Sequence, residues 1–204
     1  TDDLIAAIRD TPEVLPYIYI PVQHCSSRVL AAMNRSGSER ELEELFDRLR
    51  REIPGMVIRT TYLVGFPGET DGEHEAMLAF MDRIGFDYTS VFSFSPEEGT
   101  RAVRLDGQID DETKRERTQA AVDLAEALGF AATAARVGQT AEVIVDGIEE
   151  TDEGYELIGH AWFQAPDSDG AVHLDAEEAA VGDVLTVEFT DSFCYELVGR
   201  VVKE

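Results

Sequence analysis

Lysine is nearly absent from this chain: Lys114 and Lys203 are the only two in 204 residues. Acidic residues number 42 against 17 lysines and arginines, which gives a formal net charge of −25 at pH 7. Such a charge repels nucleic-acid phosphates and favours basic partners. A high acidic content with little lysine is also typical of halophilic proteins, so the charge alone leaves both explanations open.

Cysteine is equally scarce, with only Cys25 and Cys194, which lie far apart in the sequence. Two cysteines supply neither a disulfide framework nor a four-thiolate metal site. We therefore expect both to be free thiols, most simply buried ones.

Long apolar runs and a signal segment are also missing, so we expect a cytoplasmic protein without a membrane anchor. With 44% hydrophobic residues, the chain has enough apolar material for one large or two small domains. It begins at Thr1 without a methionine, and we therefore expect it to be a segment of a longer protein.

The first part of the chain alternates short apolar strands with long helical patterns. Strands are predicted at 17–22, 57–65 and 86–94, and helices at 38–53, 71–85 and 110–136. Connections of this length are typical of βα units and a parallel sheet. Three strands are too few for a complete barrel, and residues 2–14 resemble the end of a preceding helix. We therefore expect the upstream half of the sheet to lie outside this chain.

The pattern changes at the boundary that we place between Val137 and Gly138. The remaining residues form short apolar stretches separated by Asp-Gly and Gly-Asp turns, at 139–147, 154–166, 170–175, 182–191 and 195–202. This spacing predicts a small all-β barrel of the OB type. The expected domains are therefore 1–137 and 138–204.

The turn "GFPGET" after the second strand is the first candidate site. It matches neither a Walker A loop nor the G-x-G-x-x-G fingerprint. Gly65 and Gly68 let a ligand approach the backbone closely, and Pro67 stiffens the turn. Thr70 or Asp71 is expected to cap the following helix. An ordinary βα turn with cap residues is the competing interpretation.

Three further positions carry polar groups near the strands. Gln23 and His24 end the first strand, at the carboxyl edge where ligands bind in βα barrels, although a structural histidine is as plausible. Arg59 lies within a strand, where a charge is costly unless paired, so we expect it to meet a carboxylate.

The end of the third strand, "FSFSPEEGT", is the last candidate. It places Ser93 and Ser95 at the same edge, followed by Glu97 and Glu98, for which a solvated loop is the simplest interpretation. Catalytic triads, HExxH and CxxC pairs are absent. The chemistry must therefore come from a cofactor or from residues outside this chain.

Together, "YIYIPVQHCSSRVLAAMNRSGS", "IRTTYLVGFPGET", "FSFSPEEGTRA" and the C-terminal barrel resemble the radical-SAM methylthiotransferases from Pro16 to Val202. The dipeptide "QH", Arg59-Thr60-Thr61 and "SPEEGT" are similar to the RimO-type branch. That branch implies methylthiolation of an aspartate β-carbon in small-subunit ribosomal protein twelve; the sister MiaB branch modifies a tRNA adenosine. The implied fold is the C-terminal half of a radical-SAM, TIM-like (βα) barrel over 1–137, followed by an OB-like TRAM domain over 138–204.

The resemblance also implies cofactors, namely S-adenosyl-L-methionine (SAM) and two [4Fe–4S] clusters in the full-length enzyme. The family binds the SAM-cleaving cluster through a CxxxCxxC loop, which this chain lacks, and Cys25 and Cys194 match no cluster position. We therefore expect the isolated chain to be inactive, without catalytic or metal-binding residues of its own. The implied SAM-pocket residues are Gln23, Arg59, Gly65, Phe66, Gly68, Glu69, Phe94 and Ser95.

The distribution of charge favours a protein substrate. Residues 138–204 hold 17 acidic residues and two basic ones, Arg200 and Lys203, a net charge of −15. An acidic TRAM domain suits docking of a basic ribosomal protein, whereas a tRNA-binding domain should be basic. A tRNA methylthiotransferase and a non-catalytic TRAM-type binding module are the alternatives.

Overall fold

The computed structural model describes residues 1–151, 154–175 and 179–202. They form two compact units, Thr1–Leu128 and Gly129–Glu204. Of the charged residues counted above for 138–204, six lie outside the described residues: Asp152, Glu153, Glu177, Glu178, Lys203 and Glu204.

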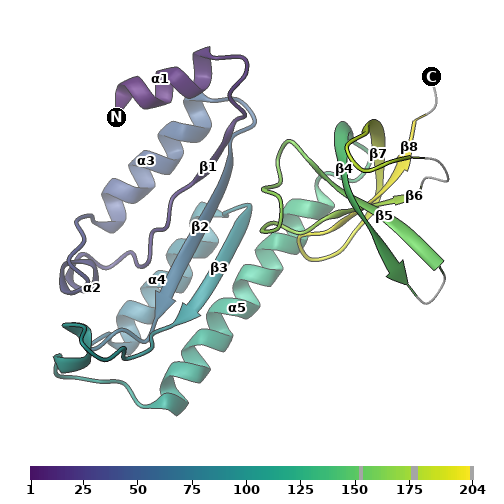
Figure 1. The fold of residues 1–204 in the computed structure, drawn as a ribbon. Helices are drawn as coiled ribbons and strands as arrows, with labels where there is room; N and C mark the ends of the chain where they lie inside the picture. The colour runs from purple at the N-terminus through teal and green to yellow at the C-terminus, as the bar shows by residue number, and fades with distance from the viewer. Residues whose placement is uncertain (152–153, 176–178, 203–204) are drawn as a thin grey trace. The chain divides into compact units, whose positions relative to one another are not determined.

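The first unit is an α/β arrangement around a parallel three-stranded sheet (Figure 1). Its elements are α1 (Asp2–Asp10), β1 (Tyr17–Tyr19), α2 (Ser27–Ala32), α3 (Glu39–Glu52), β2 (Val57–Val64), α4 (Asp71–Ile84), β3 (Tyr88–Ser93), a 3₁₀ helix (Ala102–Arg104) and α5 (Asp111–Ala134), which extends into the second unit. The strands are ordered β1-β2-β3 and pair in parallel, which confirms the predicted sheet.

Local sequence signals set the helix ends. Ser38 caps α3 by accepting a hydrogen bond from the Glu41 amide. Thr70 caps α4, and Glu73 completes a capping box with it. Gly85 ends α4 in the left-handed conformation, at φ 61°, where glycine carries no steric cost.

The core of the first unit lies between the sheet and its helices. Side chains alternate along β2, so Ile58, Tyr62 and Val64 point into this core. Phe46 of α3 packs edge-on against Phe86, with ring centroids 5.0 Å apart. The faces that α3 and α4 turn toward this core carry the buried residues Phe46, Leu49, Ile53, Met77, Phe80, Met81 and Ile84.

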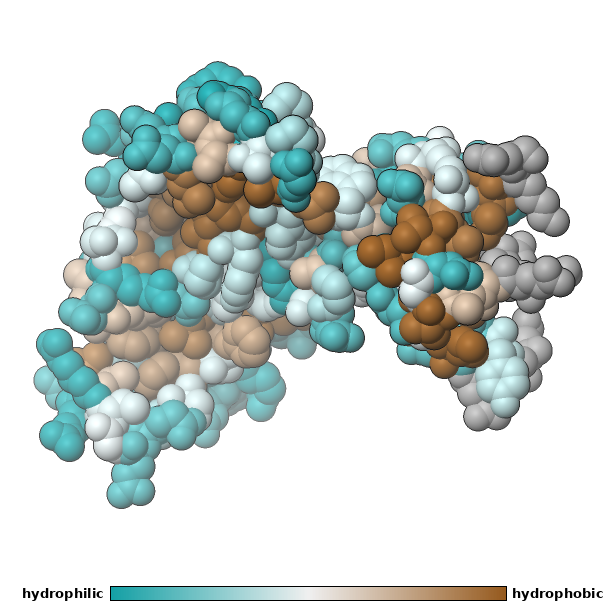
Figure 2. All heavy atoms as spheres, turned by 45° about the horizontal axis from the view of Figure 1, so that its top comes forward, coloured by the Kyte–Doolittle hydropathy of each residue, from teal (hydrophilic) through white to brown (hydrophobic). Residues whose placement is uncertain are grey.

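The second sheet face carries a different set of side chains. Arg59, Thr61 and Leu63 alternate with the core residues of β2 and therefore lie on this face. The neighbouring strands add Tyr19 and Phe92, which are 51% and 57% exposed. Figure 2 shows apolar surface among polar groups on this unit.

The second unit contains a closed five-stranded barrel. Its strands are β4 (Thr140–Thr151), β5 (Gly154–Ala161), β6 (Val172–Asp175), β7 (Val184–Ser192) and β8 (Leu197–Val201), in the order β4-β5-β6-β8-β7. This confirms the all-β prediction. The strand predicted at 154–166 ends earlier, at Ala161, because a turn follows in which the Gln164 side chain accepts the Ala161 amide proton.

The end of α5 belongs to the barrel unit. Thr133 Oγ1 donates a hydrogen bond to the Phe193 carbonyl oxygen, 2.7 Å away. A Cβ placed on Gly129 would lie 2.4 Å from the Tyr195 ring, so only glycine fits there. The compact units therefore divide within α5, and the domain boundary at Val137–Gly138 stays a prediction. Within the described residues, no helix has the length and apolarity needed to cross a membrane.

Candidate functional site

The turn between β2 and α4 lies at the carboxyl edge of the sheet. Gly65 and Gly68 adopt φ values of 78° and 83°, the left-handed region that favours glycine. The Gly65 amide donates to Glu69 Oε2 at 3.0 Å, and the Glu69 amide donates to the Phe66 carbonyl oxygen at 2.9 Å. The carboxylate of Glu69 thus closes the turn on itself.

Glu69 is fully buried, and Arg117 of α5 is its cationic partner. The Glu69 side chain is 0% exposed and that of Arg117 is 11% exposed. Arg117 Nη1 donates to Glu69 Oε1 at 2.9 Å and to the Glu69 main-chain oxygen at 3.1 Å. Its Nη2 donates to Asp71 Oδ1 at 2.6 Å. A single guanidinium therefore holds both the side chain and the backbone of Glu69.

Two buried histidines face the same carboxylate. His24 Nδ1 accepts the Ser26 amide proton, so Nε2 carries the ring proton of the neutral form, 3.7 Å from Glu69 Oε2. His74 Nδ1 lies 3.9 Å from Glu69 Oε1. Burial lowers the pKa of His24 to about 4 and lowers the pKa of His74, so both rings are neutral at pH 7. Burial also raises the pKa of Glu69, against the opposing effects of Gly65 and Arg117.

A second arginine contacts the turn from α2. Arg28 Nη2 donates to the Gly68 carbonyl oxygen at 2.6 Å, and Arg28 Nε donates to Glu73 at 2.9 Å. Burial acts to raise the pKa of Glu73, but hydrogen bonds from Arg28, Thr70 and Ser26 outweigh it and lower that pKa to about 2.

The turn has two further contacts, one with Gly107 in the segment before α5 and one with Lys114 in the first turn of α5. The Gly68 amide donates to the Gly107 carbonyl oxygen at 2.8 Å. A Cβ on Gly65 would lie 2.5 Å from Lys114 Cγ, so the lysine stem fills the space beside this glycine. The space on this side of Gly65, where a ligand was expected to approach the backbone, is therefore occupied by the Lys114 side chain.

Gln23 lies at the same sheet edge in an uncommon backbone conformation. It is a non-glycine residue at φ 67°, and strain of this kind often accompanies binding sites. Its amide donates to the Thr61 carbonyl oxygen, and its own carbonyl oxygen accepts the Leu63 amide proton. The chain after β1 thus stays paired with β2 and places Gln23 level with Tyr62.

Phe66 and Phe94 pack together below the edge. Their ring centroids lie 5.2 Å apart in an edge-on arrangement, and both residues are buried with Val29. Ser95 follows at the surface. Both aromatic rings therefore help build the edge itself, and Ser95 is the exposed polar group beside them.

Arg59 does not join this cluster. It pairs with Tyr19 and Tyr88 in the first half of β2, six residues before Gly65, or roughly 20 Å of extended chain. Its Nη2 donates to Ser90 Oγ at 3.0 Å, and its guanidinium lies 5.6 Å from the centre of the Tyr19 ring. The carboxylate partner expected from the sequence stays a prediction.

Sequence reasoning missed Arg28, Lys114 and Arg117, all three of which support the turn. Each lies at least 40 positions from the glycine or glutamate it contacts, so no spacing pattern reveals the contact. The available signal was Glu69: a carboxylate in a glycine turn between buried elements requires a cation.

Neither the cysteines nor any described carboxylate cluster offers a metal site. Cys25 is buried, and burial raises the pKa of its thiol to about 12, so it is protonated at pH 7. Cys194 lies half-buried in the other unit. Among residues 1–151, 154–175 and 179–202, no group of three histidines, cysteines or carboxylates is arranged to hold a metal ion.

The barrel presents exposed apolar and charged groups. Ile144 of β4 and Val184 of β7 are directly paired and are 42% and 56% exposed, and Figure 2 shows apolar surface on this unit. His173 lies between Glu156 and Glu196, at 3.0 and 3.3 Å. Burial acts to lower the pKa of His173, but the two carboxylates outweigh it and raise that pKa.

Two family matches follow the same order as the two units. Residues 1–81 match the Radical SAM superfamily, and residues 137–202 match the TRAM domain. The solved structure of coproporphyrinogen III oxidase (HemN) from Escherichia coli, described as a radical SAM enzyme, is similar with a TM-score of 0.53. The match covers 78% of this chain and 42% of the HemN chain at 14% identity, which supports a similarity of fold alone.

Curated relatives match nearly the whole chain. The protein named ribosomal protein uS12 methylthiotransferase RimO from Trichormus variabilis is 42% identical over 202 residues, which is 99% of this chain and 45% of that protein. The protein of the same name from Trichlorobacter lovleyi is 39% identical over 204 residues, 100% of this chain and 45% of that protein. The chain thus spans less than half the length of the curated relatives it matches. The glycine turn at the sheet edge and the TRAM-matched barrel agree with this similarity, which extends over nearly the whole chain to the RimO-type radical-SAM methylthiotransferases.

Proposed function

We propose that the protein containing this chain methylthiolates an aspartate β-carbon of ribosomal protein uS12. In this proposal, the first unit supplies one wall of the SAM pocket and the TRAM barrel docks the substrate. The left-handed glycine turn at the carboxyl edge of the sheet is the observation that carries the proposal, because ligands of βα barrels bind at that edge. The names of the relatives supply the substrate.

The residues at this edge fit a SAM molecule. Gln23 and Ser95 offer polar side chains that are at least partly accessible, and the turn from Gly65 to Gly68 offers backbone groups. Phe66 and Phe94 hold the edge from below, and Glu69 holds the turn. Arg59 lies on the sheet face opposite the helices, further from the edge. In this proposal it contacts the part of the SAM molecule that extends away from the turn.

The iron–sulfur clusters do not fit the residues of this chain. The Cys25 thiol is buried and protonated, and Cys194 lies in the other unit. We therefore assign the cluster ligands to residues outside these 204. Reductive cleavage of SAM supplies the hydrogen-abstracting radical in this enzyme class, and the residues described here orient SAM and exclude water.

The charge of the barrel supports a basic protein as substrate. Residues 138–204 carry a net charge of −15, and Glu142 and Asp146 flank Ile144 of the exposed Ile144–Val184 pair on β4. A basic segment gains from both the apolar contact and the complementary potential. A tRNA backbone would be repelled by the same surface.

The experiment supplies the full-length protein with SAM and a reductant, and offers uS12 and tRNA separately. We expect a methylthio mass increment on uS12, located on an aspartate by peptide fragmentation. Modification of tRNA with uS12 unchanged would replace this proposal with the tRNA alternative, and modification of neither would favour a non-catalytic binding module.

A further inference from the structure

Two side chains from the first turns of α5 reach the β2–α4 turn: the stem of Lys114 packs beside Gly65, and Arg117 is the one that hydrogen-bonds to the turn. Arg117 contacts Glu69 at its carboxylate and at its main-chain oxygen, and the same carboxylate receives the Gly65 amide proton. The carboxylate oxygens are divided between the two partners, Oε1 to Arg117 and Oε2 to Gly65. The direction in which the carboxylate points is therefore set from α5.

We propose that Arg117 is a positioning residue for the SAM site, which fixes the backbone of the β2–α4 turn through Glu69 before the ligand binds. The proposal rests on the proposed function for the identity of the ligand. Its structural part, that Arg117 orders residues 65–69, is independent of that identity.

Arg117 is the cation that stabilises the buried carboxylate of Glu69. The Glu69 side chain is 0% exposed, and a buried carboxylate is costly unless it is paired and hydrogen-bonded. The neighbouring His24 and His74 have lowered pKa values and stand beyond hydrogen-bond distance, at 3.7 and 3.9 Å. They do not substitute for the guanidinium at pH 7.

The geometry requires an arginine at this position. Nη1 of Arg117 serves two oxygens of Glu69 while Nη2 is held by Asp71 in the first turn of α4. A planar guanidinium bridges these acceptors with a fixed fork of donors. A lysine supplies the charge but not the fork, so it should restore the contact only in part.

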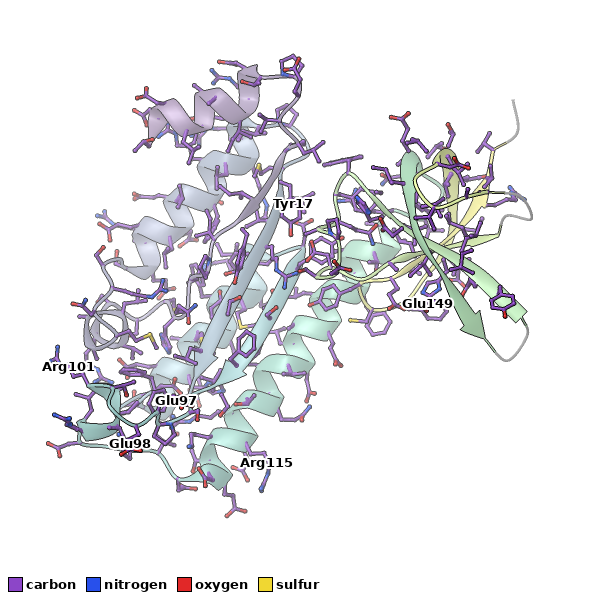
Figure 3. The ribbon with its side chains drawn as sticks, viewed as in Figure 1. Tyr17, Glu97, Glu98, Arg101, Arg115 and Glu149 are labelled. Carbon is purple, nitrogen blue, oxygen red and sulfur yellow. The ribbon has the colours of Figure 1, made fainter. Side chains whose placement is uncertain are left out.

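Two other arginines near the turn show what is particular to Arg117. Arg28 also reaches the turn, but its side chain is 56% exposed, and exposed ion pairs contribute little. Arg115, two positions earlier on α5, is 74% exposed, lies 3.8 Å from Glu112 and points away from the sheet (Figure 3). Arg115 therefore provides a matched control on the same helix.

The test compares Arg117→Met, Arg117→Lys and the control Arg115→Met in the full-length protein. Amide hydrogen exchange of the peptide covering residues 65–69 is measured without SAM, and the SAM dissociation constant by equilibrium dialysis. For Arg117→Met we expect clearly faster exchange in that peptide and about ten-fold weaker SAM binding, which is the loss of about one charge-assisted hydrogen bond. Arg117→Lys should show exchange and SAM affinity between those of Arg117→Met and the parent, and Arg115→Met should match the parent in both.

Kinetics separate positioning from a role in the reaction. Arg117→Met should raise KM for SAM. At saturating SAM its kcat should stay within about two-fold of the parent, because only the binding geometry is lost. Unchanged exchange at residues 65–69, or unchanged SAM affinity, in a folded Arg117→Met protein would overturn the proposal.

Misfolding of Arg117→Met would leave Arg117→Lys and the double variant Glu69→Gln/Arg117→Met as the deciding proteins. The double variant removes both charges, so it should fold and still show fast exchange in the turn; parent-like exchange in it would overturn the proposal. Failure of the parent to bind SAM would contradict the proposed function, whereas the exchange result without SAM would still decide whether Arg117 orders the turn.

Discussion

Glu69 Oε2 lies 3.0 Å from the Gly65 amide nitrogen, so the residue that ends the glycine turn also fastens the residue that begins it. The turn is therefore a closed loop whose shape depends on a buried carboxylate. Because Gly65 adopts φ 78° and borders the stem of Lys114, this position has no room for a side chain.

Replacement of Gly65 by alanine should destabilise the first unit by about 2 kcal/mol, through left-handed backbone strain and collision with Lys114. The matched control is Gly72→Ala, since a Cβ at Gly72 meets nothing within 4 Å and this residue lies within α4. That change should be neutral or stabilise by about 0.5–1 kcal/mol. Urea unfolding, followed by the circular dichroism signal of the helices, measures the stability of both variants. Equal changes in the free energy of unfolding for the two variants would contradict the conclusion that Gly65 has no room for a side chain.

His24 predicts a loss of stability in mild acid. Its folded pKa of about 4 lies below the ordinary value of 6.5, so the unfolded state binds the proton first as the pH falls. The contribution of His24 is complete above pH 6.5 and is lost toward pH 4, by up to about 3 kcal/mol. Unfolding of the parent and of His24→Gln across this range tests this, and the variant should show the weaker dependence on pH. Parallel curves for the two proteins would show that His24 does not titrate in this way.

His173 predicts the opposite dependence in the barrel. Its folded pKa is raised by Glu156 and Glu196, so its stabilising contribution is complete below pH 6.5 and is lost as the pH rises through the folded value. His173→Gln should therefore cost more stability at about pH 5.5 than at about pH 8.5. Fluorescence of Trp162, the single tryptophan, reports unfolding of this unit. A loss of stability in His173→Gln that does not change with pH would show that the ion pairs with Glu156 and Glu196 do not stabilise the barrel.

Docking of uS12 should weaken as salt rises, because an acidic surface attracts a basic partner through charges that ions screen. The dissociation constant measured between about 50 and 500 mM salt should increase steadily. A repeat with Glu142→Gln tests the position of the surface, since the variant should bind less tightly at low salt and depend less on salt. Affinity that does not respond to salt would refute electrostatic docking.

Much of the fold was predictable because its signals are local. The cap residues Ser38 and Thr70, the helix end at Gly85 and the alternation along β2 each reflect neighbours within a few positions. The βα order then predicts a parallel sheet, and the change of pattern after Val137 predicts the barrel.

The candidate site was predictable only in part. The glycine turn and Gln23 were expected at the sheet edge, since strand ends meet there. The contact of Arg117 with Glu69 joins residues 48 positions apart, and the packing of Lys114 against Gly65 depends on how α5 returns to the sheet. Arg59 was grouped with the turn because of the family resemblance; an extended strand separates it from Gly65 by roughly 20 Å, and its place in the SAM pocket stays a prediction.

The most direct measurement uses a photoreactive azidoadenine analogue of SAM with the full-length protein, followed by peptide mapping. We predict that the label lies on residues of the sheet edge, within the peptides containing Gln23, Gly65–Glu69 or Phe94–Ser95, and that excess SAM prevents the labelling. Competable labelling found only elsewhere in the protein would contradict the assignment of this edge as a wall of the SAM site.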